Sequence, residues 1–112
     1  MNTNRKDARL DTKLSSSIKG TGESKRHFCI IKNVSHKGVF LTAKASFVLG
    51  QTVECIISFE EKSITFFGIV RRVGEDEFGI DGYGIEIIEI AEDNKRVLEE
   101  FIELGYLPPV AE

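Results

Sequence analysis

The chain has 112 residues, of which 41% are hydrophobic and 29% charged, and a formal net charge of −3. This size suits one domain, and the composition is that of an ordinary globular protein. A membrane-spanning helix is excluded because the chain has no run of about 18 apolar residues. The polar N-terminus also lacks the apolar centre of a signal peptide. We therefore expect a single cytoplasmic domain over residues 1–112.

The net charge conceals an uneven distribution along the chain. Residues 1–40 contain nine Lys or Arg and three Asp or Glu, whereas residues 41–112 contain six and fifteen. A basic segment of this kind can attract a small anion to one end of a domain. The acidic remainder would repel the extended phosphate backbone of a polynucleotide. We therefore expect a compact anionic ligand and no polynucleotide.

Alternating apolar and polar residues predict a domain rich in β-strands. A basic segment, residues 1–9, comes first. Alternation over 10–18 then favours a strand, although the four-residue spacing of Leu10 and Leu14 would also suit a helical turn. Further strands are predicted at 28–31, 39–43, 53–59, 64–73 and 83–90. Five or six short strands over residues 10–90 indicate a sandwich or a small closed barrel.

Glycines and charged runs mark the expected connections between these strands. Loops are predicted at 20–22 and 74–82, and a hairpin connection at 60–63. Gly68 lies inside an apolar run, which indicates a bulge or a sharp bend of the kind that small barrels need.

The last part of the chain predicts a helix. Acidic residues lead from Glu92, where they complement the helix dipole, and Gly105 ends the run. Apolar residues recur at helical spacing: Val97, Leu98, Phe101, Ile102 and Leu104. We expect one amphipathic helix over 92–104, with its apolar face against the barrel or against a partner.

Two short patterns in the basic segment point to a ligand. Arg5 and Arg9 form R-x-x-x-R, and guanidinium groups bind phosphates and the O6/N7 edge of guanine through paired hydrogen bonds. Asn33, Ser35 and Gly38 form N-x-S-x-x-G, and Asn or Ser in a turn can bond another guanine edge. Each pattern alone is weak, since such residues are common in turns and at solvated termini. Together they describe a site for a small guanine nucleotide with phosphates.

These two motifs, in this order and at this separation, resemble the PilZ domain, a bacterial receptor for cyclic di-GMP. The strand between the motifs and the closing helix agree with that family, so the resemblance covers about residues 4–106. Residues 83–87 also look like its late strand, which contains a glycine. The resemblance implies an all-β fold: a six-stranded antiparallel β-barrel with one C-terminal α-helix.

The resemblance also implies the ligand and the residues that hold it. Arg5 and Arg9 would grip the phosphates and guanine faces of cyclic di-GMP, and Asn33, Ser35 and Gly38 would line the guanine pocket. The basic and glycine residues beside these motifs are further candidates: Lys6, Lys37 and Gly84. Binding would order residues 1–9 across the mouth of the barrel and change the surface offered to an unidentified protein effector.

Other kinds of site have weaker signals. His27 and His36 lack a nucleophile and an acid at a recognisable spacing, and the sequence has no metal-ligand cluster, so we expect neither an enzyme nor a metal site. Cys29 and Cys55 lie in separate apolar runs without a C-x-x-C arrangement, which favours two reduced, buried thiols.

Two binding functions compete with the receptor. One is a PilZ-like protein-interaction module that does not require nucleotide. The other is a barrel for single-stranded nucleic acid that stacks bases on phenylalanines, against which we expect the eight phenylalanines to lie in the core. The regulated process and the choice between monomer and homodimer stay open.

Overall fold

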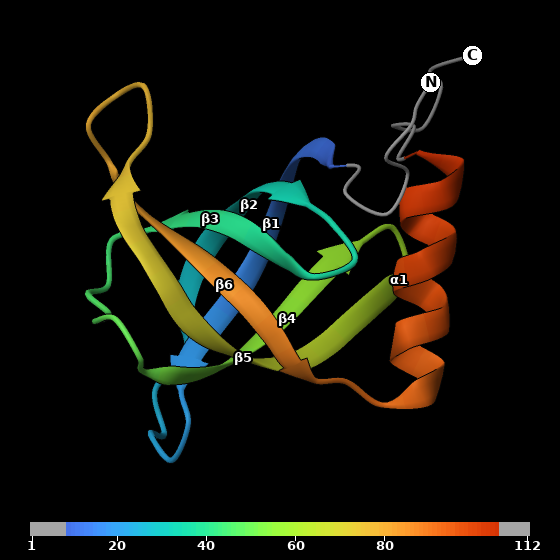
Figure 1. The fold of residues 1–112 in the computed structure, drawn as a ribbon, viewed down its shortest axis with the longest axis horizontal. Coiled ribbons are helices and arrows are strands. Elements are labelled where there is room, and N and C mark those ends of the chain that lie inside the picture. Colours follow the sequence, from blue (N-terminus) through green and yellow to red (C-terminus); the bar gives the residue numbers. More distant parts are fainter. Residues whose placement is uncertain (1–8, 106–112) are drawn as a thin grey trace.

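Residues 9–105 are described in the computed structural model, and they form a barrel closed at one side by a helix (Figure 1). The elements are β1 (Leu10–Gly20), β2 (His27–Val34), β3 (Gly38–Ala43), β4 (Thr52–Phe59), β5 (Lys62–Glu75), β6 (Asp81–Glu89) and α1 (Glu92–Leu104). Residues 10–18 are part of a strand, so alternation, and not the spacing of the two leucines, gave the correct structure.

All strand pairs are antiparallel, and the order β1-β2-β3-β6-β5-β4 closes because β4 pairs back on β1. Each strand therefore has a hydrogen-bonded neighbour on both sides, which protects the sheet from pairing with other chains. The predicted fold, a six-stranded antiparallel barrel with one C-terminal helix, is confirmed.

Inward-facing apolar side chains fill the barrel, and the largest fully buried ones include Ile18, Leu41 and Phe66. Cys29 and Cys55 belong to this core as free thiols, as predicted. Burial raises the pKa of the Cys29 thiol from 9.0 to about 12 and also raises the pKa of Cys55. Both sulfurs are therefore protonated at neutral pH and act as small apolar groups.

The helix α1 packs its apolar face on the barrel. Leu98 and Phe101 are buried, and the ring centroids of Phe101 and Phe59 of β4 lie 4.5 Å apart. At the start of α1, Asn94 Oδ1 accepts a 2.9 Å hydrogen bond from the backbone N–H of Thr65 in β5. Of the two arrangements expected for the helix, packing on the barrel is the one observed.

The loop between β5 and β6 is shorter than the sequence predicts. Pairing continues from Gly74 opposite Gly82 to Glu75 opposite Asp81, so only residues 76–80 connect the strands. Asp76 closes this loop, because its Oδ1 accepts the backbone N–H groups at 78 and 80 at 2.8 and 3.0 Å. These backbone hydrogen bonds lower the pKa of the Asp76 carboxyl.

Gly68 lies at a register shift of β5 against β6, as the sequence predicts. The expectation that all eight phenylalanines lie in the core is wrong for three of them. Phe28, Phe67 and Phe78 are 65%, 36% and 78% exposed. Phe28 lies on the outward side of β2, where the alternation places it between inward neighbours, and Phe78 lies at the tip of the β5–β6 loop. A hydrophobic residue type alone does not show which side of a strand faces the core.

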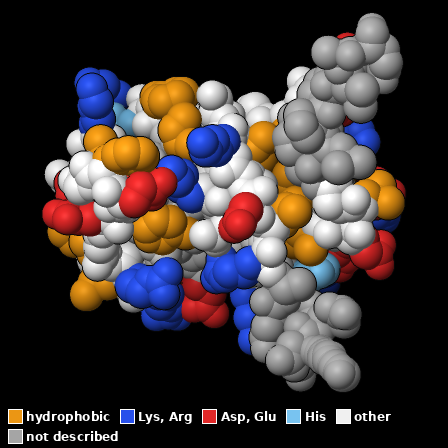
Figure 2. Space-filling model, turned by 90° about the horizontal axis from the view of Figure 1, so that it is seen from above, with side chains coloured by type: hydrophobic (Ala, Val, Ile, Leu, Met, Phe, Trp, Pro, Cys, Tyr) orange, Lys and Arg blue, Asp and Glu red, His pale blue; other side chains and the backbone are white. Residues whose placement is uncertain are grey.

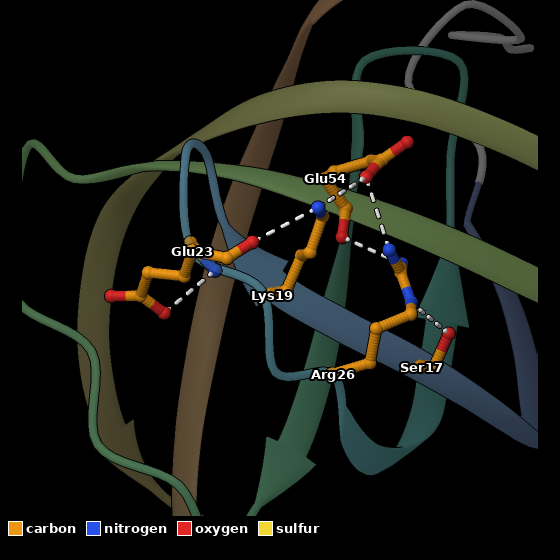
Figure 3. A network of polar contacts seen from close by, with 6 residues as sticks. Ser17, Lys19, Glu23, Arg26 and Glu54 are labelled. Atoms are coloured by element: carbon orange, nitrogen blue, oxygen red, sulfur yellow. Dashed lines mark hydrogen bonds and ion pairs between the residues drawn. The ribbon is translucent and has the colours of Figure 1, made fainter.

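One polar network on the outside of the barrel uses several of the charges that surround β1 (Figure 3). Arg26 donates from Nε to Ser17 Oγ at 3.0 Å and from Nη1 to Glu54 Oε1 at 3.0 Å. Lys19 Nζ donates to the backbone oxygen of Glu23 at 3.0 Å and lies 3.7 Å from Glu54 Oε1. These cations join the β1–β2 connection to β4 and are already paired within the protein.

Candidate functional site

The N-x-S-x-x-G motif forms the end of β2 and the turn into β3. Ser35 N–H donates to the carbonyl oxygen of Gly38 at 2.8 Å, which closes the turn. The hydroxyl of Ser35 is buried and accepts the backbone N–H groups of Lys37 and Gly38 at 3.2 and 3.3 Å. Ser35 therefore satisfies the backbone groups of its own turn and holds the shape of that turn.

Gly38 is required by close packing between strands. A Cβ atom there would lie 2.0 Å from the carbonyl oxygen of Ile85 in β6. Gly38 is not among the glycines with positive φ, so a left-handed backbone is not the reason for a glycine here. The absence of a side chain lets β3 pair closely with β6, with Gly38 opposite Glu86.

A hydrogen bond joins the two motifs. Arg9 Nη1 donates to Oδ1 of Asn33, 24 residues further along the chain. The contact places a guanidinium group beside the turn motif, as a shared ligand site would require. Arg5 and Lys6, which were also predicted to bind ligand, lie outside the described residues.

Several predicted site residues lie in one row across the outside of the barrel. Following the direct partners from β1 through β2, β3 and β6 to β5, the row contains Asp11, Asn33, Phe40, Gly84 and Arg72. None of these five is buried, whereas the neighbouring partners Val34, Val39, Ile85 and Val70 all lie in the core. The pleat thus gathers polar groups from five strands on one outer surface.

A hollow of about 310 Å³ lies at the end of this row. Its walls bring together Arg9, Lys37 and Gly38 from the basic segment with Gly84 from β6, all of which were predicted site residues. The remaining lining residues are Val39, Arg71, Arg72, Ile85 and Glu86. Four cationic side chains and one carboxylate surround this space, so its electrostatic potential favours an anion.

Sequence reasoning missed Arg71 and Arg72 of β5. A register shift between Val70 and Arg72 lets two consecutive residues both face outward. Arg71 Nε donates to Glu86 Oε1 at 2.6 Å, and the Arg72 guanidinium carbon lies 5.8 Å from the centroid of the Phe40 ring. The available signal was a pair of adjacent arginines at the end of an apolar strand in the acidic part of the chain.

Two predicted residues do not line this hollow. Asn33 faces a neighbouring hollow of about 500 Å³, whose other walls include Asp11 and Lys32. Ser35 lies beneath the turn, with its hydroxyl bonded to the backbone. On the face shown in Figure 2, basic side chains lie between hydrophobic ones over the barrel.

Two further kinds of site were sought among residues 9–105. They contain no group of three or more His, Cys, Asp or Glu side chains placed to hold a metal ion. In the same part of the chain, no helix has the length and apolar character needed to cross a membrane.

Solved structures with a similar fold include three bacterial proteins. MotI/DgrA, the inhibitor of motility from Bacillus subtilis, is 23% identical with a TM-score of 0.78; the match covers 92% of this chain and 51% of that one. The PilZ domain of YcgR from Escherichia coli, solved with c-di-GMP, is 9% identical with a TM-score of 0.72 and 91% coverage of both chains. PlzA of Borreliella burgdorferi, also in complex with c-di-GMP, is 20% identical with a TM-score of 0.60, covering 89% of this chain and 41% of that one.

The chain thus spans about half the length of MotI/DgrA and less than half of PlzA. No curated protein sequence matches it. The family model described as the PilZ domain, however, matches residues 3–104, which include both motifs, the whole barrel and the helix. Because this match covers most of the sequence and the closed barrel has the same fold as solved PilZ proteins, the chain belongs to the PilZ domain family.

Proposed function

We propose that this protein is a receptor for cyclic di-GMP. The observation that carries the proposal is the hydrogen bond from Arg9 to Asn33, which joins the two motifs at the edge of a cationic hollow. The presence of c-di-GMP in two PilZ structures of similar fold supports the same ligand. The binding residues are Arg5, Arg9, Asn33, Ser35 and Gly38, with Lys6, Lys37 and Gly84 at the margin.

The chemistry of these residues suits a cyclic dinucleotide that carries two phosphates. Arg9 can donate to a phosphate with one edge of its guanidinium group while its flat face covers a purine. Asn33 has one amide oxygen, which accepts from Arg9 without ligand. Binding would release that oxygen to accept from the guanine N–H groups as Arg9 turns to the phosphates. Ser35 and Gly38 would contribute by holding the turn and its close approach to β6.

The proposed output is a change of surface. Ligand would order residues 1–9 over the barrel, and a protein effector would recognise the ordered form. No chemical step on the ligand and no metal are part of this mechanism. The receptor would act in the bacterial cytoplasm, as a monomer or a homodimer.

Isothermal titration calorimetry with cyclic di-GMP tests the proposal, with GTP as the competing guanine nucleotide. We expect selective binding of cyclic di-GMP and loss of binding in Arg9→Ala, because a charge-assisted contact in a partly desolvated site is worth about 2–5 kcal/mol. Lys13→Ala is the matched control, since it removes an exposed cation of β1 outside the hollow. Undiminished affinity in a folded Arg9→Ala variant would refute the assigned site.

The exposed phenylalanines favour a second candidate, an interaction module that does not require nucleotide. Phe28 and Phe78 are mostly exposed and line one groove with Ile80, and exposed aromatic groups are typical of protein-contact surfaces. The same titration separates the two functions. Absence of heat with cyclic di-GMP, from protein shown to be folded by circular dichroism, would favour the module.

A further inference from the structure

The outer row of the barrel ends in an arginine whose position is fixed from two sides. Arg72 is the direct partner of Gly84, and Gly84 is the direct partner of Phe40. A Cβ at Gly84 would lie 3.2 Å from Arg72 Cβ and 3.5 Å from its Nε. The arginine side chain thus runs over the surface of the glycine toward the ring of Phe40 on the next strand.

The contact with Phe40 orients the Arg72 guanidinium group. Its central carbon lies over the ring, 5.8 Å from the centroid, which is within the range of a cation–π interaction. Arg72 is exposed, so the guanidinium is accessible to a ligand in the hollow that Arg72 helps to line. A guanidinium group held in this way loses less entropy when a planar ligand stacks on it.

The neighbouring Arg71 differs in its surroundings. It lines the same hollow, but its Nε donates to Glu86 Oε1 at 2.6 Å, and no aromatic contact is printed for it among the described residues. Arg71 therefore contributes charge that a carboxylate partly offsets. The two adjacent arginines provide a matched pair for comparing a planar surface with a charge.

We propose that Arg72 is a base-stacking residue of this site, whose guanidinium plane, held over Gly84 by Phe40, covers one guanine of cyclic di-GMP. The inference rests on the proposed receptor function and adds a residue from β5 to the motif residues of the N-terminal half. Because the row places Arg72 three strands away from Asn33, the two residues would contact different parts of a ligand that has two bases.

The test compares Arg72→Lys with Arg71→Lys by titration with cyclic di-GMP. Lysine keeps the positive charge and loses the plane, so we expect Arg72→Lys to weaken binding by roughly tenfold, the usual size of a desolvated cation–π or stacking contact. Arg71→Lys should change affinity by less than about threefold. The circular dichroism that the bound nucleotide shows near its base absorption should fall in Arg72→Lys at saturating ligand and stay unchanged in Arg71→Lys.

A second variant addresses the support of the arginine. Phe40→Leu removes the ring, and in that background Arg72→Lys should cost less than it does in the wild-type protein, because the plane is no longer held. Equal affinity and equal ligand dichroism in Arg72→Lys and wild type, with binding still lost in Arg9→Ala, would overturn only the stacking role. Failure of the wild-type protein to bind would overturn the receptor function and the stacking role together.

Discussion

The close approach of β3 and β6 at Gly38 predicts that Gly38→Ala destabilises the whole barrel. The new Cβ would lie 2.0 Å from the Ile85 carbonyl oxygen, whereas ordinary contacts begin at 3.4 Å. The obstacle is backbone in a paired strand, so β3 must move away from β6 by more than an ångström. That movement would also weaken the 2.8 Å bond from Ser35 N–H to the Gly38 oxygen.

The cost follows from these two effects. Overpacking of this kind costs about 1–3 kcal/mol, and a weakened hydrogen bond about 1 kcal/mol more. We therefore expect the free energy of unfolding to fall by about 3 kcal/mol, which lowers Tm by roughly 10 °C for a domain of this size. Thermal unfolding followed by circular dichroism measures the shift.

Gly74→Ala is the matched control for this experiment. Gly74 also lies in a strand, but a Cβ there would meet nothing within 4 Å, and its φ is not positive. We expect Tm of this variant to stay within about 2 °C of wild type. An equally small shift in Gly38→Ala would show that β3 can retreat at no cost and would refute the packing explanation for the glycine of the motif.

Two more predictions concern the core. Tyr83 donates from its hydroxyl to the Ala45 oxygen at 3.1 Å and accepts the buried Phe47 N–H at 3.3 Å, so Tyr83→Phe should lower stability by about 1–3 kcal/mol in urea unfolding. A loss below about 0.5 kcal/mol would show that water replaces the hydroxyl. Because burial raises the pKa of Cys29 to about 12 from 9.0, the stability due to its neutral thiol is present below pH 9.0 and is lost as pH rises toward 12. Cys29 and Cys55 should resist a thiol reagent at about pH 8 until the protein is unfolded, and rapid labelling of folded protein would contradict this burial.

The architecture could be predicted because strand alternation and helical spacing are local signals. Each strand has a period of two set by its own residues, and the apolar spacing from Val97 to Leu104 requires only one helix. The errors occur where pairing between segments decides the outcome. Glu75 and Asp81 form a strand pair although both lie in a polar, glycine-rich segment, because β5 and β6 are held together on either side of the loop.

The candidate site divides in the same way. Arg9, Asn33 and Gly38 could be chosen from the sequence because their types and spacing match a nucleotide-binding pattern. The role of Gly38 could not, since the obstacle to a side chain is Ile85, a residue of another strand. The buried hydroxyl of Ser35 was likewise assigned to a pocket wall, and its bonds to its own turn appear only in three dimensions.

The sequence by itself determined the number and order of the strands, the closing helix and the two motifs, because these depend on residues close together in the chain. The tertiary structure alone decided that Arg72 lies in the same outer row as Asn33 and Phe40. That row depends on the register of five strands and on a bulge after Val70. Strand register is set by turns, bulges and barrel closure between distant segments, so no local pattern in the chain could reveal it.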